Sequence, residues 1–382
     1  MRLRCKRWIS LLLAVVIMLT LGACGVQSQS DTTDRIAFDS LEKTGQMTLA
    51  YATQYQVEYY GDYSLITIGE DQRFLLVPEG KDVPKDLPED VVALQQPLDK
   101  TYLVSTSVMD LIRQLDRISY IRLSGSKAKD WYITEAKEAI ESGDMIYAGK
   151  YSAPDYECIL NEGCNLAIEN TMIYHTPEVK EKLEELGIPV LVERSSYESH
   201  PLGRLEWIKL YGLLFDASDE ANAYFDSQVE QITPLLDQEN IGKTIAFFSV
   251  NSSGAINVRK PGDYIAQMIT MAGGNYALAD VVPEEENALS TMNMQMEDFY
   301  NAAQGADILI YNSAIEGEIT SIDELLAKNS MFAQFDAVKT GNVYCTGKNF
   351  FQESTGMAEF VEDLHNVLVD ADADLTYLEK LN

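Results

Sequence analysis

The sequence has little of the side-chain chemistry on which most enzymes depend. Only three histidines occur in 382 residues. One of them, His200, precedes a proline, and another, His365, lies in an amphipathic helical pattern. The nucleophile pattern Gly-x-Ser-x-Gly and the zinc pattern His-Glu-x-x-His are both absent. We therefore expect no catalytic residue and no metal site. A hydrolase with dispersed catalytic residues stays open, because a catalytic triad is defined by geometry and not by spacing.

Positive charge is also scarce. The chain has 29 lysines and arginines against 60 aspartates and glutamates, a formal net charge of -31. Four of the cations, Arg2, Arg4, Lys6 and Arg7, precede an apolar run, and without them the net charge is -35. So acidic a chain repels phosphates and anionic lipid headgroups. We expect no nucleic-acid partner, and any membrane attachment must come from something other than surface charge.

The first 23 residues have the pattern of a secretory signal peptide. A basic head is followed by an apolar run over residues 8–19 and then by Leu-Gly-Ala before Cys24. The run is shorter than the roughly 20 apolar residues of a spanning helix. The segment ending at Cys24 resembles the bacterial lipobox, whose cysteine is lipidated. We expect cleavage before Cys24, a lipid anchor on it at the extracytoplasmic face of the cell membrane, and a flexible tether over residues 24–45.

Cysteine is too scarce for a disulfide framework. Of five cysteines, Cys5 leaves with the signal peptide and Cys24 is lipidated, so that Cys158, Cys164 and Cys345 remain. Their odd number argues against a framework, and no Cys-x-x-Cys pattern with partner histidines suggests zinc. We interpret them as small buried residues, with a bridge between Cys158 and Cys164 as the alternative.

Beyond the tether, short apolar runs alternate with amphipathic stretches, which is typical of α/β structure. We expect strands at residues 47–52, 65–68, 74–77, 101–104, 166–168, 189–191, 244–250, 306–311 and 342–345. We expect helices at residues 108–115, 263–272 and 357–369, and one that begins at Pro177.

One longer helical pattern separates two halves of the chain. Ala221, Phe225, Val229, Ile232 and Leu236 recur with a period near 3.6 residues. The pattern predicts an N-terminal lobe at residues 46–217, a connecting helix at 218–238 and a C-terminal lobe at 239–382. The expected fold is α/β, with two Rossmann-like lobes joined by one long helix and a ligand cleft between them.

Five segments carry a resemblance to a known family. They are residues 147–157 (YAGKYSAPDYE), 186–190 (LGIPV), 200–207 (HPLGRLEW), 272–275 (AGGN) and 305–310 (GADILI). Their order around one long helix, behind a lipobox, resembles the helix-linked solute-binding proteins of ABC importers for ferric siderophores, haem and cobalamin. The resemblance implies a monomeric receptor, not an enzyme and without a cofactor, that delivers a small molecule to an ABC permease and its ATPase. It favours a ferric chelate first and a corrinoid second.

Candidate ligand-binding residues follow strands, because open α/β sheets bind ligands at the carboxyl ends of their strands. In the first lobe they are Ser105, Thr106, Ser107, Tyr174, His175, Arg194, Tyr197 and Arg204, and in the second lobe they are Arg259, Asn312, Phe350 and Phe351. Arginines, hydroxyls and aromatic rings suit an anionic chelate or a large flat ring system. For each aromatic residue, local packing is the alternative.

Two glutamates have a different expected role. The resemblance implies that Glu157 and Glu297, near the starts of helices, dock against arginines of the permease. The alternative is that each is an acid favoured by the helix dipole.

A haem-binding receptor of the same class is kept as an alternative, as is an exported hydrolase. His175 and one of Met292, Met294 and Met296 could together ligate haem iron, although alternating methionines more often pack on a core. The tyrosine-rich residues 51–80 depart from the start of the family, and we expect an added hairpin there.

Overall fold

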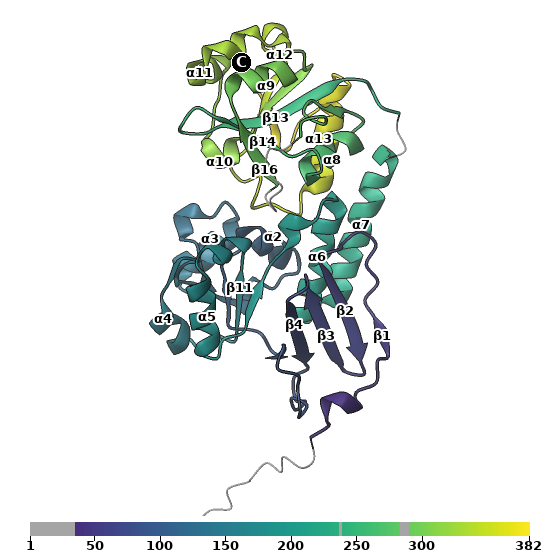
Figure 1. The fold of residues 1–382 in the computed structure, drawn as a ribbon, viewed down its shortest axis with the longest axis vertical. Coiled ribbons are helices and arrows are strands. Elements are labelled where there is room, and N and C mark those ends of the chain that lie inside the picture. Colours follow the sequence, from purple (N-terminus) through teal and green to yellow (C-terminus); the bar gives the residue numbers. More distant parts are fainter. Residues whose placement is uncertain (1–34, 237–238, 283–289) are drawn as a thin grey trace, which may run out of the picture. The chain divides into compact units, whose positions relative to one another are not determined.

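The computed structural model describes residues 35–236, 239–282 and 290–382. The signal peptide, Cys24 and residues 25–34 of the expected tether lie outside the described residues. Residues 35–41 and 82–87 form a small unit of their own. It contains the 3-10 turn Phe38–Ser40 and is held by hydrogen bonds from Phe38 N to Lys85 O and from Lys85 N to Ile36 O. All other described residues belong to one larger unit, which has the predicted mixed α/β fold (Figure 1).

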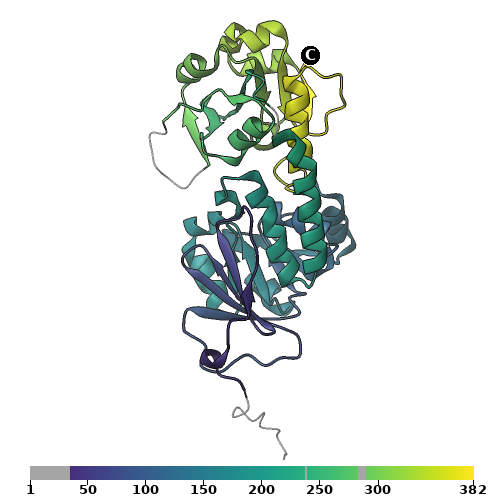
Figure 2. The ribbon, with the colours of Figure 1, turned by 90° about the vertical axis from the view of Figure 1, so that its right-hand side faces the viewer.

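A five-stranded sheet opens the larger unit, and we call it the N-terminal sheet. Its strands, in sheet order, are β1 (Gly45–Gln46), β2 (Tyr55–Tyr60), β3 (Tyr63–Ile68), β4 (Gln72–Val77) and β5 (Val91–Gln95). Strands β1 to β4 pair antiparallel, and β5 pairs parallel to β4. The expected added hairpin is therefore present, as β2 and β3, within a larger sheet. One face buries Val57, Ile66 and Phe74. The Tyr55 ring packs edge-on against that of Trp207 in helix α6 (Pro201–Leu214), with 5.0 Å between the ring centroids. Figure 2 shows the purple strands of this sheet beside teal helices that follow later in the chain.

The strand expected at residues 47–52 is absent, so that prediction is wrong. The backbone amides of residues 50–52 donate instead to the carboxylate of Glu206 at 2.8–3.1 Å. Those of residues 53 and 54 donate to Glu198 at 2.9–3.0 Å. Buried backbone donors need partners, and here two carboxylates from α6 and the loop before it replace a neighbouring strand.

The first lobe follows, built on a wholly parallel sheet. Its strands, in sheet order, are β12 (Val190–Val192), β11 (Leu166–Glu169), β6 (Thr101–Leu103), β7 (Ile121–Ser124) and β8 (Ile146–Tyr147). Its helices are α2 (Thr106–Gln114), α3 (Thr134–Ser142), α4 (Tyr156–Asn161), α5 (Pro177–Glu185) and α6 (Pro201–Leu214). A short hairpin of β9 (Gly149–Lys150) and β10 (Ala153–Pro154) precedes α4. Parallel strands joined by helices give the lobe its Rossmann-like character.

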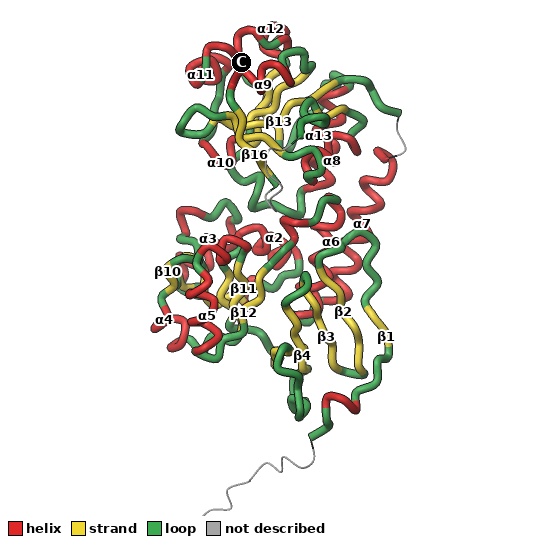
Figure 3. Tube along the Cα trace, viewed as in Figure 1, coloured by secondary structure: helices red, strands yellow, loops and turns green. Residues whose placement is uncertain are grey.

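The second lobe has a mixed seven-stranded sheet (Figure 3). Its main path is β16 (Thr291–Met294), β14 (Ile256–Arg259), β13 (Thr244–Val250), β17 (Ile308–Tyr311), β18 (Val343–Thr346) and β19 (Leu378–Lys380), with β15 (Asn275–Tyr276) also paired to β13. Its helices are α8 (Tyr264–Met271), α9 (Met296–Ala303), α10 (Ser313–Glu316), α11 (Ile322–Lys328), α12 (Asp336–Thr340) and α13 (Met357–Leu368). Apart from residues 47–52, the expected strands are present to within two residues at each end.

Helix α7 (Ser218–Leu236) connects the two lobes. It buries Ala221, Phe225 and Ile232 on one face and packs against α6 of the first lobe and α13 of the second. Residues 237–238 of the expected helix lie outside the described part of the chain. Because only one face is buried, α7 is a connecting element and not a central core helix.

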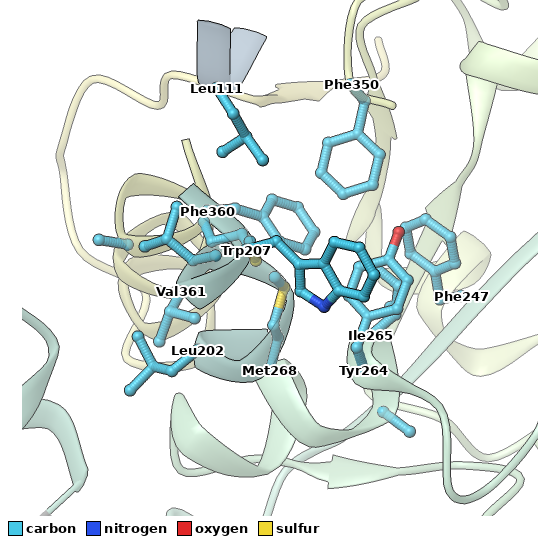
Figure 4. Close-up of a cluster of buried hydrophobic side chains, with 14 of the residues drawn as sticks. Leu111, Leu202, Trp207, Phe247, Tyr264, Ile265, Met268, Phe350, Phe360 and Val361 are labelled. Carbon is cyan, nitrogen blue, oxygen red and sulfur yellow. The ribbon is translucent and has the colours of Figure 1, made fainter. Parts of the chain in front are cut away.

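One hydrophobic cluster continues through the place where α6 meets the second lobe. Trp207 of α6 lies among Met268 of α8 and Phe360 of α13 in the close-up of Figure 4. All three side chains are at most 1% exposed. Burial of this extent contributes on the order of 2 kcal/mol for each large side chain, so the lobes share a packed base beside the connecting helix.

Candidate ligand-binding cleft

A cleft of about 560 Å³ has residues of both lobes in its walls. The first lobe contributes the loop that follows β12, and the second lobe contributes the loop between β14 and α8. The lining residues are Gln54, Arg194, Ser196, Tyr197, Glu198, Ser199, Lys260, Pro261, Gly262, Asp263 and Ser290. The volume lies within the roughly 300–1,000 Å³ typical of small-molecule sites.

Arg194 is the cationic residue of the first-lobe wall. Its guanidinium lies 5.1 Å from the ring centroid of Tyr197, and Nη1 is 3.5 Å from a carboxylate oxygen of Asp71. Its Nε is buried and has no hydrogen-bond partner among the described residues. Arg194 and Tyr197 are thus the two predicted ligand-binding residues that the structure brings together in the cleft.

Two buried glutamates fix the backbone on either side of Arg194 and Tyr197. Glu193 accepts a hydrogen bond from Ser195 N at 2.6 Å, and burial raises its pKa despite hydrogen bonds with Ser195 and the nearby Arg204 charge. Glu198 accepts from Trp207 Nε1 at 3.0 Å as well as from the amide of Gln54. Both carboxylates are therefore engaged by protein donors and hold the wall in place.

The opposite wall is held by a buried ion pair. Arg259 donates from Nε and Nη2 to the two oxygens of Asp263 at 2.7 and 2.8 Å. Asp263 also accepts from Ile265 N at 2.9 Å and so caps α8. The forked pair fixes the loop that carries Lys260 into the cleft, while Nη1 of Arg259 is not used by Asp263.

A second, much smaller cavity collects three other predicted residues. It has a volume of about 20 Å³ and is lined by Arg204, Phe350 and Phe351, among others. The Arg204 guanidinium lies 4.0 Å from the ring centroid of Tyr264. A cavity of this size holds about one water molecule, so these side chains now pack against one another.

The remaining predicted residues lie elsewhere at the strand ends. Ser105 and Asn312 are buried, and Asn312 caps α10 through Ala314 N at 3.2 Å. Thr106 and Ser107 begin α2 and are half-buried. Tyr174 and His175 are exposed at the end of the 3-10 turn Thr171–His175. As ligand contacts, these residues remain predictions.

Several cleft residues were not among the predicted ones. Lys260, Pro261 and Gly262 follow β14, and the Pro-Gly turn signal together with the strand could have revealed them. Gln54 had no such signal, because the loop that carries it is held by carboxylates distant in sequence.

The two glutamates expected to dock lie in comparable positions. Glu157 is in the first turn of α4 and Glu297 is in the first turn of α9, and both are exposed. Of the three methionines, Met292 and Met294 pack against the core from β16, and Met296 is buried in α9. This packing favours the core interpretation of the methionines over iron ligation.

Glu169, the last residue of β11, is the most unusual ionisable group of the first lobe. Its side chain is fully buried, and neither carboxylate oxygen has a hydrogen-bond partner among the described residues. Burial raises its pKa to about 8. The carboxyl group is therefore mostly protonated at neutral pH.

Some negative findings hold for the described ranges. Within them, no group of histidine, cysteine, aspartate and glutamate side chains is arranged to hold a metal ion. No helix there has the length and apolar character needed to cross a membrane. Cys158, Cys164 and Cys345 are free thiols.

The fold has the architecture of two-lobed solute-binding proteins with a cleft between the lobes. The periplasmic haem-binding protein HutB of Vibrio cholerae superposes with a TM-score of 0.57 at 16% identity, covering 70% of this chain and 98% of HutB. A possible iron-binding protein of Staphylococcus epidermidis gives 0.54 at 15% identity, covering 70% and 97%. The vitamin B12-binding protein BtuF of V. cholerae gives 0.51 at 13%, covering 72% and 98%.

Sequence comparison finds similar archaeal proteins. An uncharacterized lipoprotein of Methanocaldococcus jannaschii is 23% identical over 312 residues, covering 77% of this chain and 72% of that protein. A second uncharacterized lipoprotein of the same organism is 26% identical over 257 residues, covering 64% of each chain. No protein-family model matches the chain.

Proposed function

We propose that this chain is the extracytoplasmic solute-binding lipoprotein of an ABC importer. The observation that carries the proposal is the cleft of about 560 Å³ lined by loops from both lobes of a helix-linked α/β fold. Ligands of open α/β sheets bind where the strands end. The lipobox at Cys24 and the lipoprotein names of the similar archaeal proteins support membrane anchoring through lipid. The protein holds its solute without transforming it.

The solute class is a ferric chelate or a corrinoid, with haem as the alternative. The names of the similar proteins of known structure describe them as binding iron, haem or vitamin B12. A cleft of this volume favours a compact chelate, because a whole corrinoid would extend well beyond it. Arg194 and Tyr197 supply a cation and a ring face for it, and Tyr174 and His175 are further candidate contacts.

Capture is tested by incubating the purified protein with spent culture medium, followed by mass spectrometry and a visible absorption spectrum of the retained material. We expect each protein molecule to retain one molecule of a chemically unchanged solute. An iron–chelate charge-transfer band, a cobalt band or a Soret band then separates the three ligand classes. Release of a chemically altered product would instead support the exported hydrolase.

Delivery involves Glu157 and Glu297, one on each lobe, which dock against arginines of the permease. The double variant Glu157→Arg with Glu297→Arg is expected to lose uptake while keeping solute affinity. The matched control reverses two other exposed acids, Glu181→Arg in α5 and Asp323→Arg in α11, and should transport normally. Lost affinity in the docking variant, or equal loss of uptake in the control, would remove the docking assignment.

A further inference from the structure

The N-terminal sheet reaches the strand end that carries the cleft arginine. Gln72, the first residue of β4, donates from Nε2 to Val192 O at 3.0 Å and accepts from Val192 N at 2.7 Å. Val192 is the last residue of β12 and lies two residues before Arg194. The turn between β3 and β4 is thereby fixed beside the first-lobe wall of the cleft.

Gly69 in that turn makes room for the guanidinium of Arg194. Its φ is +59°, and a Cβ built on it would overlap Nη1 of Arg194 and lie 2.9 Å from Cζ. The guanidinium therefore occupies the space that any other side chain at position 69 would fill. Asp71, two residues on, lies 3.5 Å from the same Nη1. The turn sets both the position of the guanidinium and the charge beside it.

The loop between β1 and β2 supplies a second cleft residue through the same network of hydrogen bonds. The Gln54 carbonyl accepts from Gly69 N at 2.8 Å, and the Gln54 amide donates to Glu198 at 2.9 Å. Gln54 itself lines the cleft. A single hydrogen-bonded unit thus joins the β3–β4 turn, Gln54 and the cleft wall.

The charges of the cleft leave a positive group available to a ligand. Its two carboxylates are already engaged, Glu198 by backbone amides and Asp263 by Arg259. The Asp71 side chain is 63% exposed, and its carboxylate lies 3.5 Å from Nη1 of Arg194. Exposed ion pairs of this kind are weak. The buried Nε of Arg194 has no hydrogen-bond partner in the ranges that the structure describes. A guanidinium of this kind binds a carboxylate or phosphate in a forked geometry.

We infer that the N-terminal sheet contributes directly to the ligand site. Its β3–β4 turn positions Arg194 to bind an anionic carboxylate or phosphate group of the solute. Arg194 is the binding residue, Gly69 is a positioning residue, and Asp71 is a neighbouring anion that competes with the solute for Arg194. The inference rests on the proposed function for its claim that the anion belongs to a transported solute.

Citrate is the probe, titrated into the purified protein by calorimetry at constant ionic strength. Arg194→Gln should weaken citrate binding about tenfold or more, because a charge-assisted forked contact is lost. Gly69→Ala should weaken it several-fold, because the new methyl group displaces the guanidinium. Asp71→Asn should strengthen it about twofold, since it removes a competing anion.

Gly61→Ala is the matched control for Gly69→Ala. Gly61 lies in the β2–β3 turn of the same sheet with φ of +64°, and a Cβ there meets no atom within 4 Å. It has the same backbone strain without touching Arg194, so its citrate affinity should equal that of the unmodified protein. The inference is overturned if the unmodified protein binds no citrate, if Arg194→Gln binds it equally well, or if Gly69→Ala and Gly61→Ala behave alike.

The same variants separate this inference from the proposed function. If the protein retains a solute from spent medium and Gly69→Ala retains it as well as Gly61→Ala does, the sheet has no role while the receptor function stands. If no solute is retained but citrate binding follows the expected order, the anion site stands and the receptor function fails.

Discussion

The two lobes differ in how the charged side chains at their strand ends are used. In the second lobe, Arg259 and Asp263 satisfy each other in a buried forked pair. In the first lobe, Glu169 is buried without a hydrogen-bond partner in the described part of the chain, and Arg194 keeps an unpartnered Nε beside the cleft. Position after a strand therefore identifies a candidate residue, but the neighbours of that residue decide whether its charged group is already paired within the protein.

Substitution of Glu206 should give the largest loss of stability, because its carboxylate holds the backbone of residues 50–52, close to the cleft residue Gln54. Burial would raise its pKa, but the amides of residues 50–52 and the Lys209 ammonium outweigh this and hold the pKa below its ordinary value. Glu206→Gln leaves Lys209 buried without its carboxylate partner and should lower the free energy of unfolding by about 4 kcal/mol, measured by urea denaturation. Adding Lys209→Met should recover part of the loss; no recovery would contradict the pairing.

The same group predicts a pH dependence. A depressed folded-state pKa contributes stability above the unfolded value near 4.5, and this contribution is lost as the pH falls through the folded value. Acid titration of unmodified protein and Glu206→Gln should show the difference between them shrinking below pH of about 4.5. A constant difference would show that the carboxylate charge is irrelevant.

Arg259 should give the next effect and tests the comparison of the lobes directly. Arg259→Gln leaves Asp263 buried without its cation and should lower the free energy of unfolding by about 3 kcal/mol. The matched change in the first lobe, Arg194→Gln, leaves only the exposed Asp71 behind and should cost less than about 1 kcal/mol. Thermal or urea unfolding of both variants provides the measurement. Equal losses would mean that the two arginines are used in the same way.

Glu169 should affect stability in the opposite direction. Its pKa is raised to about 8 by burial, so the folded state keeps a proton that the unfolded state releases above about 4.5. Stability is therefore lost as the pH rises between these values. Glu169→Gln should raise the free energy of unfolding at pH 8 and change it little at pH 4, with a gain that grows as the pH rises between these values. Glu141→Gln, at an exposed position, is the control. A stability change in Glu169→Gln that does not depend on pH would contradict the raised pKa of Glu169.

Thr355 should give the smallest effect, at the contact that links the lobes. It donates from N and Oγ1 to the buried Asp110 of α2 at 2.7 and 2.6 Å. Thr355→Val loses the hydrogen bond from the hydroxyl group and should lower the free energy of unfolding by about 1 kcal/mol, whereas Thr355→Ser keeps that bond.

Because this contact and α7 both join the lobes, we also expect X-ray scattering to show only a small compaction of the protein when solute binds. A large compaction of the unmodified protein would count against a stiff connection.

Sequence alone predicted most of the fold and little of the site. Hydrophobic periodicity located β13 and α7 well, because neighbouring strands and helices bury their apolar side chains. It failed at residues 47–52, where Glu206, distant in sequence, takes the backbone donors. Arg194 was predicted from its place after β12, but the roles of Gly69 and Gln54 depend on contacts between separate sheets, which no local pattern encodes.

Hydrogen–deuterium exchange with and without the solute retained from spent medium tests the central claim most directly. If the solute lies between the lobes, the amides of residues 194–199 and 262–263, one wall from each lobe, should exchange more slowly together when it is bound. Protection of one wall only, or protection confined to residues outside the cleft, would contradict a receptor that binds its solute between the two lobes.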